Sequence, residues 1–396
     1  MSHLPTLLDM DLDHKTVLVR VDFNVPFKTG TIEISDDSRI RAALETIRYL
    51  VESGSKIILC THIGRPKGQV VEDLRTKPMA DRLSRLLGRP VYTAPDCVGP
   101  GVVKAVSKMS SGDILMLENL RFHSAEEANN SAFAFELSSL AEVYVNDAFG
   151  AAHRAHASTV GLPMLLPSAA GFLLQREIEF LGSTLDSPKR PLLAIIGGAK
   201  ISDKIKVLEH LVPKVNNLLI GGGMAASFLK ATGINVGSSM VEEDMIESAN
   251  KILRSASDLK VDLLLPTDVV ISNKFIDSAS HKIVNVTQIP DGWMIMDIGP
   301  ETSKVYARAT EDAGTIIWNG PMGVCEWKAF AHGTNYLCKT LSTLHDATTV
   351  IGGGSTADAV GALELSDAMT HVSTGGGASL EFLEGKILPG VAALMR

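Results

Sequence analysis

The stretch VLVRVDF (residues 17–23) is a nearly continuous apolar run that ends at an acidic and an aromatic residue. Eight similar runs follow, nearly all separated by helix-like segments: KIILCTH (56–62), DILMLEN (113–119), EVYVND (142–147), LLAIIGG (192–198), NLLIGGG (217–223), DLLLPTD (262–268), TIIWNGP (315–321) and TVIGGGS (349–355). A parallel sheet covered on both faces requires this alternation, because each crossover needs a helix. The pattern predicts an α/β fold of two doubly wound parallel-sheet (Rossmann-like) domains.

A helix-like segment divides the two halves. GLPMLLPSAAGFLLQREIEFLGSTLDSPKRP (161–191) opens and closes with prolines, and its apolar residues recur at roughly helical spacing. The predicted organisation is a domain at 1–170, an interdomain helix and hinge at 171–186 with bending points at Gly171 and Gly182, and a domain at 187–379. The alternative is a helix that packs on one domain only. In such sheets ligands bind outside the carboxyl ends of the strands, and we expect a deep cleft between the two domains.

Composition excludes several classes of protein. The net charge of -8 argues against a nucleic-acid surface. The amino terminus lacks the apolar core of a signal peptide, and no apolar run approaches the roughly 18 residues of a membrane span, so we expect a cytoplasmic protein with no membrane partner. Four cysteines without a C-x-x-C pair indicate neither a zinc site nor a disulfide framework.

Glycine turns dominate the second half. No stretch matches a P-loop, and G-x-G-x-x-A occurs at Gly221 and at Gly352 without the acidic residue that a dinucleotide site needs about twenty positions on. Four strands nevertheless end in glycine at a helix entrance, in IIGGAK, LIGGGMA, VIGGGST and VSTGGGAS. Glycine allows close backbone approach, and a helix start offers N–H groups to an anion, so these turns together predict a polyphosphate site.

Polar residues gather at the predicted strand ends of the first half. They are Asp22, Asn24, Arg39 (at a helix start), His62, Arg65, Arg121, His153, Arg154 and His156. A carboxylate beside an amide suits hydroxyl groups, while arginines with histidine suit phosphate and carboxylate. The two last histidines could suggest a metal pair, but they lack a Cys or Glu partner at ligand spacing, which favours anion contact or structural hydrogen bonds.

Eight motifs resemble the phosphoglycerate kinase family, in order along nearly the whole chain: RVDFNVP, THIGRPKG, LENLRF, NDAFGAAHRAHAST, IGGAKISDKI, GGGMA, WNGPMGVCEW and STGGGASLEFLEGK. The resemblance implies reversible phosphoryl transfer from 1,3-bisphosphoglycerate to MgADP, giving 3-phosphoglycerate and MgATP. It also implies a monomer, and a carboxyl-terminal segment, 380–396, that returns to the first domain.

The resemblance also implies site residues. The three-carbon acid would be bound by Asp22, Asn24, Arg39, His62, Arg65, Arg121 and Arg154. The nucleotide would be bound by Gly198, Ala199, Lys200, Lys204, Gly222, Asn319, Pro321, Glu326, Gly353, Gly354, Ser355 and Thr356. Arg39 and Lys200 would contact the transferring group on domain closure, with N–H donors from the helix starts at Gly353 and Gly376.

One position departs from the family pattern. The family usually has Asp after the glycines of IGGG as a Mg²⁺ partner, and this chain has Ser355. A hydroxyl is a poorer magnesium ligand than a carboxylate, so we expect Mg²⁺ to be held mainly by the nucleotide phosphates and water. Two alternatives remain at this point: an NAD(P)-dependent dehydrogenase, and a catalytically impaired anion-binding homologue.

Overall fold

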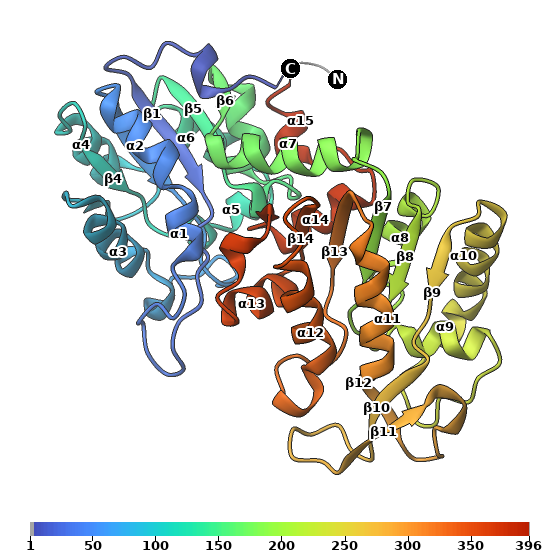
Figure 1. Cartoon of the computed structure of the whole chain (residues 1–396). Coiled ribbons are helices and arrows are strands. Elements are labelled where there is room, and N and C mark those ends of the chain that lie inside the picture. Colours follow the sequence, from blue (N-terminus) through green and yellow to red (C-terminus); the bar gives the residue numbers. More distant parts are fainter. Residues whose placement is uncertain (1–3, 396) are drawn as a thin grey trace. The chain divides into compact units, whose positions relative to one another are not determined.

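The computed structural model describes residues 4–395 and divides into two compact units. The first unit runs to Glu179 and includes the segment from Ile387 onward, and the second unit is Phe180–Lys386. Figure 1 shows strands flanked by helices within each unit. Within residues 4–395, no helix is both long and apolar enough to cross a membrane.

The first unit is built on a six-stranded parallel sheet in the order β3-β4-β2-β1-β5-β6. Its strands are β1 (Thr16–Val21), β2 (Lys56–Cys60), β3 (Tyr92–Thr93), β4 (Ile114–Met116), β5 (Val143–Asp147) and β6 (Ser168–Ala170). Its helices are α1 (Ser38–Ala42), α2 (Leu44–Glu52), α3 (Lys77–Leu87), α4 (Pro100–Ser107), α5 (Ser124–Glu127), α6 (Ser131–Ser138) and α15 (Pro389–Ala392).

Strand β1 shows how this sheet is covered. Because side chains alternate between faces, Val19 and Val21 enter one apolar cluster together with Ile47 of α2 and Leu83 of α3. Arg20 therefore faces the opposite side of the sheet. There the first unit buries polar groups as well as apolar ones.

The second unit repeats the plan with a parallel sheet in the order β15-β14-β13-β7-β8-β9. Its strands are β7 (Leu192–Ile196), β8 (Asn217–Ile220), β9 (Asp262–Leu264), β13 (Thr315–Asn319), β14 (Thr348–Gly352) and β15 (His371–Val372). Its helices are α8 (Ile205–Leu211), α9 (Ala225–Ala231), α10 (Ile246–Asp258), α11 (Pro300–Glu311), α12 (His332–Leu341), α13 (Gly354–Ala362) and α14 (Gly376–Leu383).

Both faces of this sheet are covered by separate apolar clusters. Ile196 packs with Leu208 of α8 on one face, whereas Ile195 packs with Tyr306 of α11 and Leu337 of α12 on the other. The prediction of two doubly wound α/β units is confirmed. The sequence reading missed a second, antiparallel sheet in the order β11-β10-β12: β10 (Asp268–Ser272), β11 (His281–Asn285) and β12 (Met294–Ile298).

Helix α7 (Phe172–Asp186) spans the point where the first unit gives way to the second. Gly171 immediately precedes it and Gly182 lies in its interior, so the structure has one unbroken helix over nearly the range expected at 171–186, and bending at the two glycines stays a prediction. A Cβ at Gly182 would meet only the ring of Phe382, at 3.9 Å. The returning segment is also shorter than expected, because the second unit extends to Lys386 and includes all of α14.

Candidate functional site

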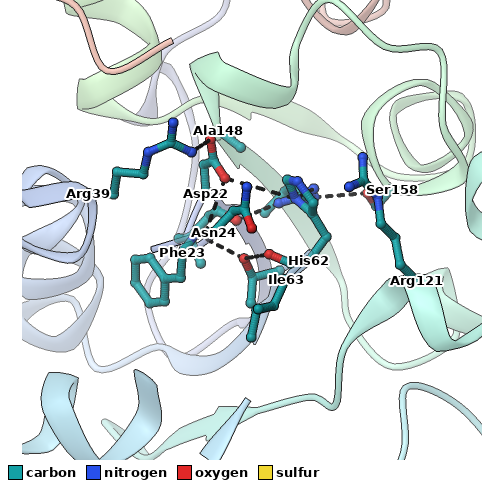
Figure 2. Close-up of polar contacts among 12 residues, drawn as sticks. Asp22, Phe23, Asn24, Arg39, His62, Ile63, Arg121, Ala148 and Ser158 are labelled. Carbon is teal, nitrogen blue, oxygen red and sulfur yellow. Dashed lines mark hydrogen bonds and ion pairs between the residues drawn. The ribbon is translucent and has the colours of Figure 1, made fainter. Parts of the chain in front are cut away.

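The carboxyl ends of the parallel strands in the first unit carry the polar residues singled out above. Asp22 and Asn24 follow β1, His62 follows β2, Arg121 lies in the turn after β4, and Arg154 follows β5. Parallel strands end at the same edge of a sheet, so the topology gathers these side chains from distant parts of the chain. Figure 2 shows several of them in one cluster.

Asp22 is the acidic centre of this cluster. Its Oδ2 accepts a hydrogen bond from Arg39 Nη1 at 2.8 Å, and its Oδ1 lies 3.9 Å from His62 Nδ1. Asn24 accepts a hydrogen bond from the backbone N–H of Gly64 at 2.9 Å, which fixes the loop after β2. Asp22 is buried, whereas Arg39 is partly exposed and free to meet a ligand with its remaining donors.

The cluster is strongly positive. Arg121 is 4% exposed, donates to the carbonyl of Gly64 at 2.7 Å and lies 3.2 Å from Glu127. Burial, with Arg154 nearby, lowers the pKa of Arg121 despite the opposing effect of Glu127. Burial lowers the pKa of His62 well below its usual value, and the surrounding arginines lower it further, so His62 is neutral. The net positive charge of the cluster suits an anionic ligand.

The remaining basic residues differ in exposure. Arg65 is exposed and Arg154 is half-buried, so both can turn toward a ligand. His156 is buried, and its Nδ1 lies 3.7 Å from Glu126 Oε1. Burial and the neighbouring arginines lower the pKa of His156 to about 4. Among residues 4–395, neither His153 nor His156 belongs to a cluster of three side chains that could ligate a metal ion, and the anion-contact or structural role of His156 stays a prediction.

The sequence reading missed three buried residues of this cluster: Arg20, Glu126 and Ser158. Arg20 Nη2 lies 2.9 Å from His62 Nδ1, and Arg20 Nε donates to Ser158 Oγ at 2.9 Å. Ser158 Oγ in turn donates to Glu126 Oε1 at 2.5 Å. One signal was available: Arg20 is a charged residue inside an otherwise apolar strand, and a buried charge needs partners. Nothing in the local sequence marks the other two.

In the second unit the glycine turns pack backbone against backbone. Gly198 N–H donates to the carbonyl of Pro321 at 3.1 Å, and a Cβ at Gly222 would lie 2.5 Å from Gly198 N. Gly222 also has a φ of +69°, which L side chains rarely adopt. The carbonyl of Ala199 lies against the same turn, 2.8 Å from where a Cβ at Gly223 would stand. These turns therefore require glycine for their close approach.

Lys204 and Asn319 form the polar centre beside these turns. Lys204 Nζ donates a hydrogen bond to Asn319 Oδ1, and burial lowers the pKa of Lys204 to about 8. Asn319 is fully buried, and its Nδ2 has no hydrogen-bond partner among residues 4–395. A buried donor without a protein partner can satisfy its hydrogen bond with a ligand acceptor or an ordered water. Lys200, by contrast, is exposed at the end of its glycine turn.

Two helix starts lie side by side in the same unit. A Cβ at Gly376, the first residue of α14, would lie 3.0 Å from the backbone N of Gly354, the first residue of α13. Thr356 Oγ1 accepts a hydrogen bond from Gly320 N–H at 2.9 Å, which ties α13 to the turn after β13. Neighbouring helix starts offer unpaired N–H groups and positive dipole ends, which suit phosphate oxygens.

The start of α13 carries a hydroxyl where a carboxylate would suit a Mg²⁺ ion, and the nearest carboxylate in the helix is the exposed Asp358. Ser355 is exposed there and offers a hydroxyl, and the first turn, residues 354–357, contains no carboxylate. Mg²⁺ binds proteins through one or two carboxylates together with substrate phosphates. Glu326 is exposed in the loop after β13, and its Oε2 lies 3.9 Å from Cys325 Sγ. A Mg²⁺ ion held mainly by the nucleotide phosphates and water stays a prediction.

The fold and these contacts define a two-unit α/β protein with an arginine-rich oxyanion cluster in one unit and glycine turns with helix starts in the other. A sequence model of the family described as phosphoglycerate kinase matches residues 7–386. The chain belongs to the phosphoglycerate kinase family, whose members are phosphotransferases with a carboxyl group as acceptor.

Individual relatives agree with this assignment. The chain is 55% identical to a phosphoglycerate kinase of Moorella thermoacetica over 389 residues, 98% of each chain. It is 54% identical to one of Microcystis aeruginosa over 391 residues, 98% of this chain and 97% of the relative. The solved structure of phosphoglycerate kinase from Coxiella burnetii matches with a TM-score of 0.87 at 38% identity, covering 99% of both chains. The dehydrogenase and the impaired binding homologue gain no support from these matches.

Proposed function

We propose that this chain catalyses reversible transfer of the acyl phosphate of 1,3-bisphosphoglycerate to MgADP, as a cytoplasmic monomer. What supports the proposal is that the first unit gathers cationic side chains at the carboxyl edge of its parallel sheet, and the second unit gathers glycine turns and helix starts at the same edge of its own sheet. In-line phosphoryl transfer asks little covalent chemistry of a protein, so positioning and charge neutralisation are what these sites must supply.

The acid belongs to the first unit. Arg39, Arg65, Arg121 and Arg154 supply planar forks that match phosphate and carboxylate oxygens, and His62 adds a neutral donor. Asp22 and Asn24 are suited to the hydroxyl group of a three-carbon acid, because both carry acceptor oxygens. The positive charge of the cluster favours the anionic acid over a neutral sugar.

The nucleotide belongs to the second unit. Its phosphates would contact the N–H groups of Gly353, Gly354 and Gly376, with Ser355 and Thr356 at the same helix start. Lys204 and Lys200 would neutralise phosphate charge, and the Nδ2 of Asn319 would donate to a ligand oxygen. The remaining proposed contacts are Gly198, Ala199, Gly222, Pro321 and Glu326.

The reacting group would be contacted by Arg39 from the acid-binding unit and Lys200 from the nucleotide-binding unit. Domain closure is the proposed step that brings acid and nucleotide together and excludes water. Both cations would then stabilise charge that develops on the transferring phosphoryl oxygens.

The proposal is tested by a coupled assay. 3-Phosphoglycerate and MgATP are supplied, and glyceraldehyde-phosphate dehydrogenase with NADH reports the acyl phosphate formed. We expect activity in the wild type and a loss of about 10²- to 10³-fold in kcat for Lys200→Ala, the size seen when one charge-stabilising group is removed. Lys206→Ala, an exposed lysine in α8, is the matched control and should keep wild-type activity. An inactive wild type that still binds both ligands would contradict the proposal.

A further inference from the structure

Arg20 is buried in an unusual place. It lies within the apolar strand β1 and is 1% exposed, so its charge is removed from water. A buried charge is tolerated only where hydrogen bonds and an opposite charge compensate it. The partners of Arg20 therefore indicate what holds this residue in position.

All three guanidinium nitrogens of Arg20 have a partner. Nε donates to Ser158 Oγ at 2.9 Å, Nη1 donates to the carbonyl of Val21 at 2.5 Å, and Nη2 lies 2.9 Å from His62 Nδ1. Figure 2 shows His62 with Asp22 on one side and Ser158 on the other. Arg20 thus joins the strand end of β1 to the imidazole at the strand end of β2.

The contact with Arg20 decides the state of the imidazole. A guanidinium has five N–H donors and no acceptor, so Nη2 can only donate to His62 Nδ1. His62 Nδ1 must therefore carry a lone pair, and the ring proton must be on Nε2. A doubly protonated ring would set N–H against N–H at 2.9 Å. The groups that face His62 are Asp22 at 3.9 Å and the cations of Arg20, Arg39, Arg121 and Arg154.

Glu126 completes the arrangement from the other end. It is fully buried, and its two oxygens accept from Ser158 Oγ at 2.5 Å and from Ser158 N–H at 3.0 Å. Ser158 Oγ accepts from Arg20 and donates to Glu126, so its hydroxyl direction is determined at both ends. The carboxylate of Glu126 is therefore a buried negative charge that compensates the positive charge of Arg20. The two side chains are connected by hydrogen bonds through the hydroxyl group of Ser158.

We propose that Glu126, Ser158 and Arg20 are positioning residues that hold His62 as a neutral imidazole with its hydrogen on Nε2, ready to donate to an oxygen of the acid substrate. This inference rests on the proposed function for the identity of the acid. The positive charge of the site is then carried by the arginines. His62 contributes a hydrogen bond of fixed direction and no charge.

The tautomer is measured directly in the ligand-free, full-length protein. Long-range ¹H–¹⁵N correlation spectra of ¹⁵N-labelled protein distinguish Nδ1–H from Nε2–H rings, and comparison with His62→Gln assigns the signal. We expect His62 to show the Nε2–H pattern unchanged between pH 6 and pH 8. A cationic ring or the Nδ1–H tautomer at pH 7 would overturn the proposal. This readout does not depend on turnover, so it stands even if the coupled assay fails.

Ser158→Ala tests the chain of hydrogen bonds from Glu126 through Ser158 to Arg20. The variant removes both the hydroxyl oxygen that accepts from Arg20 Nε and the hydroxyl hydrogen that is donated to Glu126. We expect mixed tautomers of His62 and a rise of about tenfold in KM for 3-phosphoglycerate, with little change in KM for MgATP. Ser158→Thr keeps the hydroxyl and should restore both readouts if Ser158→Ala folds poorly. Ser55→Ala is the control, because Ser55 is also buried in this unit and donates instead to the carbonyl of Leu12 at 2.8 Å. Wild-type tautomer and KM in a folded Ser158→Ala variant would overturn the proposal.

Discussion

Arg39 Nη1 donates to Asp22 Oδ2 at 2.8 Å, so the arginine proposed to meet the transferring phosphoryl group is already held by a carboxylate. The side chain of Asp22 is 9% exposed and that of Arg39 is 32% exposed. Asp22 can therefore orient the guanidinium while other donors of Arg39 stay available. Orientation of this kind reduces the reorganisation needed when charge develops.

Arg39→Lys should lower kcat by about 10²-fold, because lysine supplies a point charge but not the planar fork. The measurement is steady-state kinetics with 3-phosphoglycerate and MgATP. Arg41→Lys is the matched control two residues along, since Arg41 pairs with Asp37 and is 54% exposed. Equal kcat values for the two variants would contradict the role proposed for Arg39.

The lowered pKa of Lys204 predicts that kcat/KM for MgATP depends on pH. The pKa of Lys204 is lowered to about 8 by burial, so the free enzyme loses this cation as pH rises through about 8. We expect kcat/KM for MgATP to fall above that pH, because phosphate then meets a neutral amine. Lys204→Arg should remove the fall, since arginine stays charged, while Lys206→Arg should leave it in place. A wild-type profile that is flat from pH 7 to pH 9 would count against this assignment.

Replacing Ser355 by Asp should change how strongly nucleotide binding depends on Mg²⁺. Ser355→Asp adds a carboxylate at the start of α13, where the chain offers only a hydroxyl. We expect MgADP to bind about tenfold more tightly to the variant, with little change for ADP in EDTA. Titration calorimetry with and without Mg²⁺ measures both values. An identical Mg²⁺ effect in the two proteins would show that this position does not influence the metal.

The raised pKa of the buried Asp147 side chain predicts that the free energy of unfolding depends on pH. Asp147 ends β5, and its Oδ1 accepts from the backbone N–H of Leu173 and Leu174 at 2.9 and 3.3 Å in the first turn of α7. Burial raises the pKa of Asp147 to about 7. The folded state thus binds this proton more tightly than the unfolded chain, so the contribution of Asp147 to the free energy of unfolding decreases as pH rises from about 4 to about 7.

Asp147→Asn keeps an acceptor oxygen for the helix start and cannot ionise. Relative to the wild type, its free energy of unfolding should therefore rise by at least about 1 kcal/mol between pH 5 and pH 8. Urea unfolding at the two pH values measures this difference. Asp13→Asn, at an exposed position, is the control. A difference that is equal at both pH values would contradict the prediction.

Local sequence patterns predicted much of this fold. β1, β7 and β13 lie within the apolar runs that indicated them or begin one residue earlier, because a strand buried on both faces must be apolar along its length. In the antiparallel sheet, β10 and β12 are short apolar segments that the sequence analysis passed over, whereas β11 is mostly exposed and polar, so no apolar run marks that strand.

The sequence by itself determined the class of fold, the glycine turns and the polar residues at the strand ends, because periodicity and residue type act within a few positions of each other. Only the tertiary structure decided that Arg20 contacts both Ser158 and His62, and that Lys204 is buried against Asn319. Those pairs are separated by up to 138 residues along the chain, so no local pattern records them. Their charges and tautomers follow from burial and from partners that meet only when the sheets assemble.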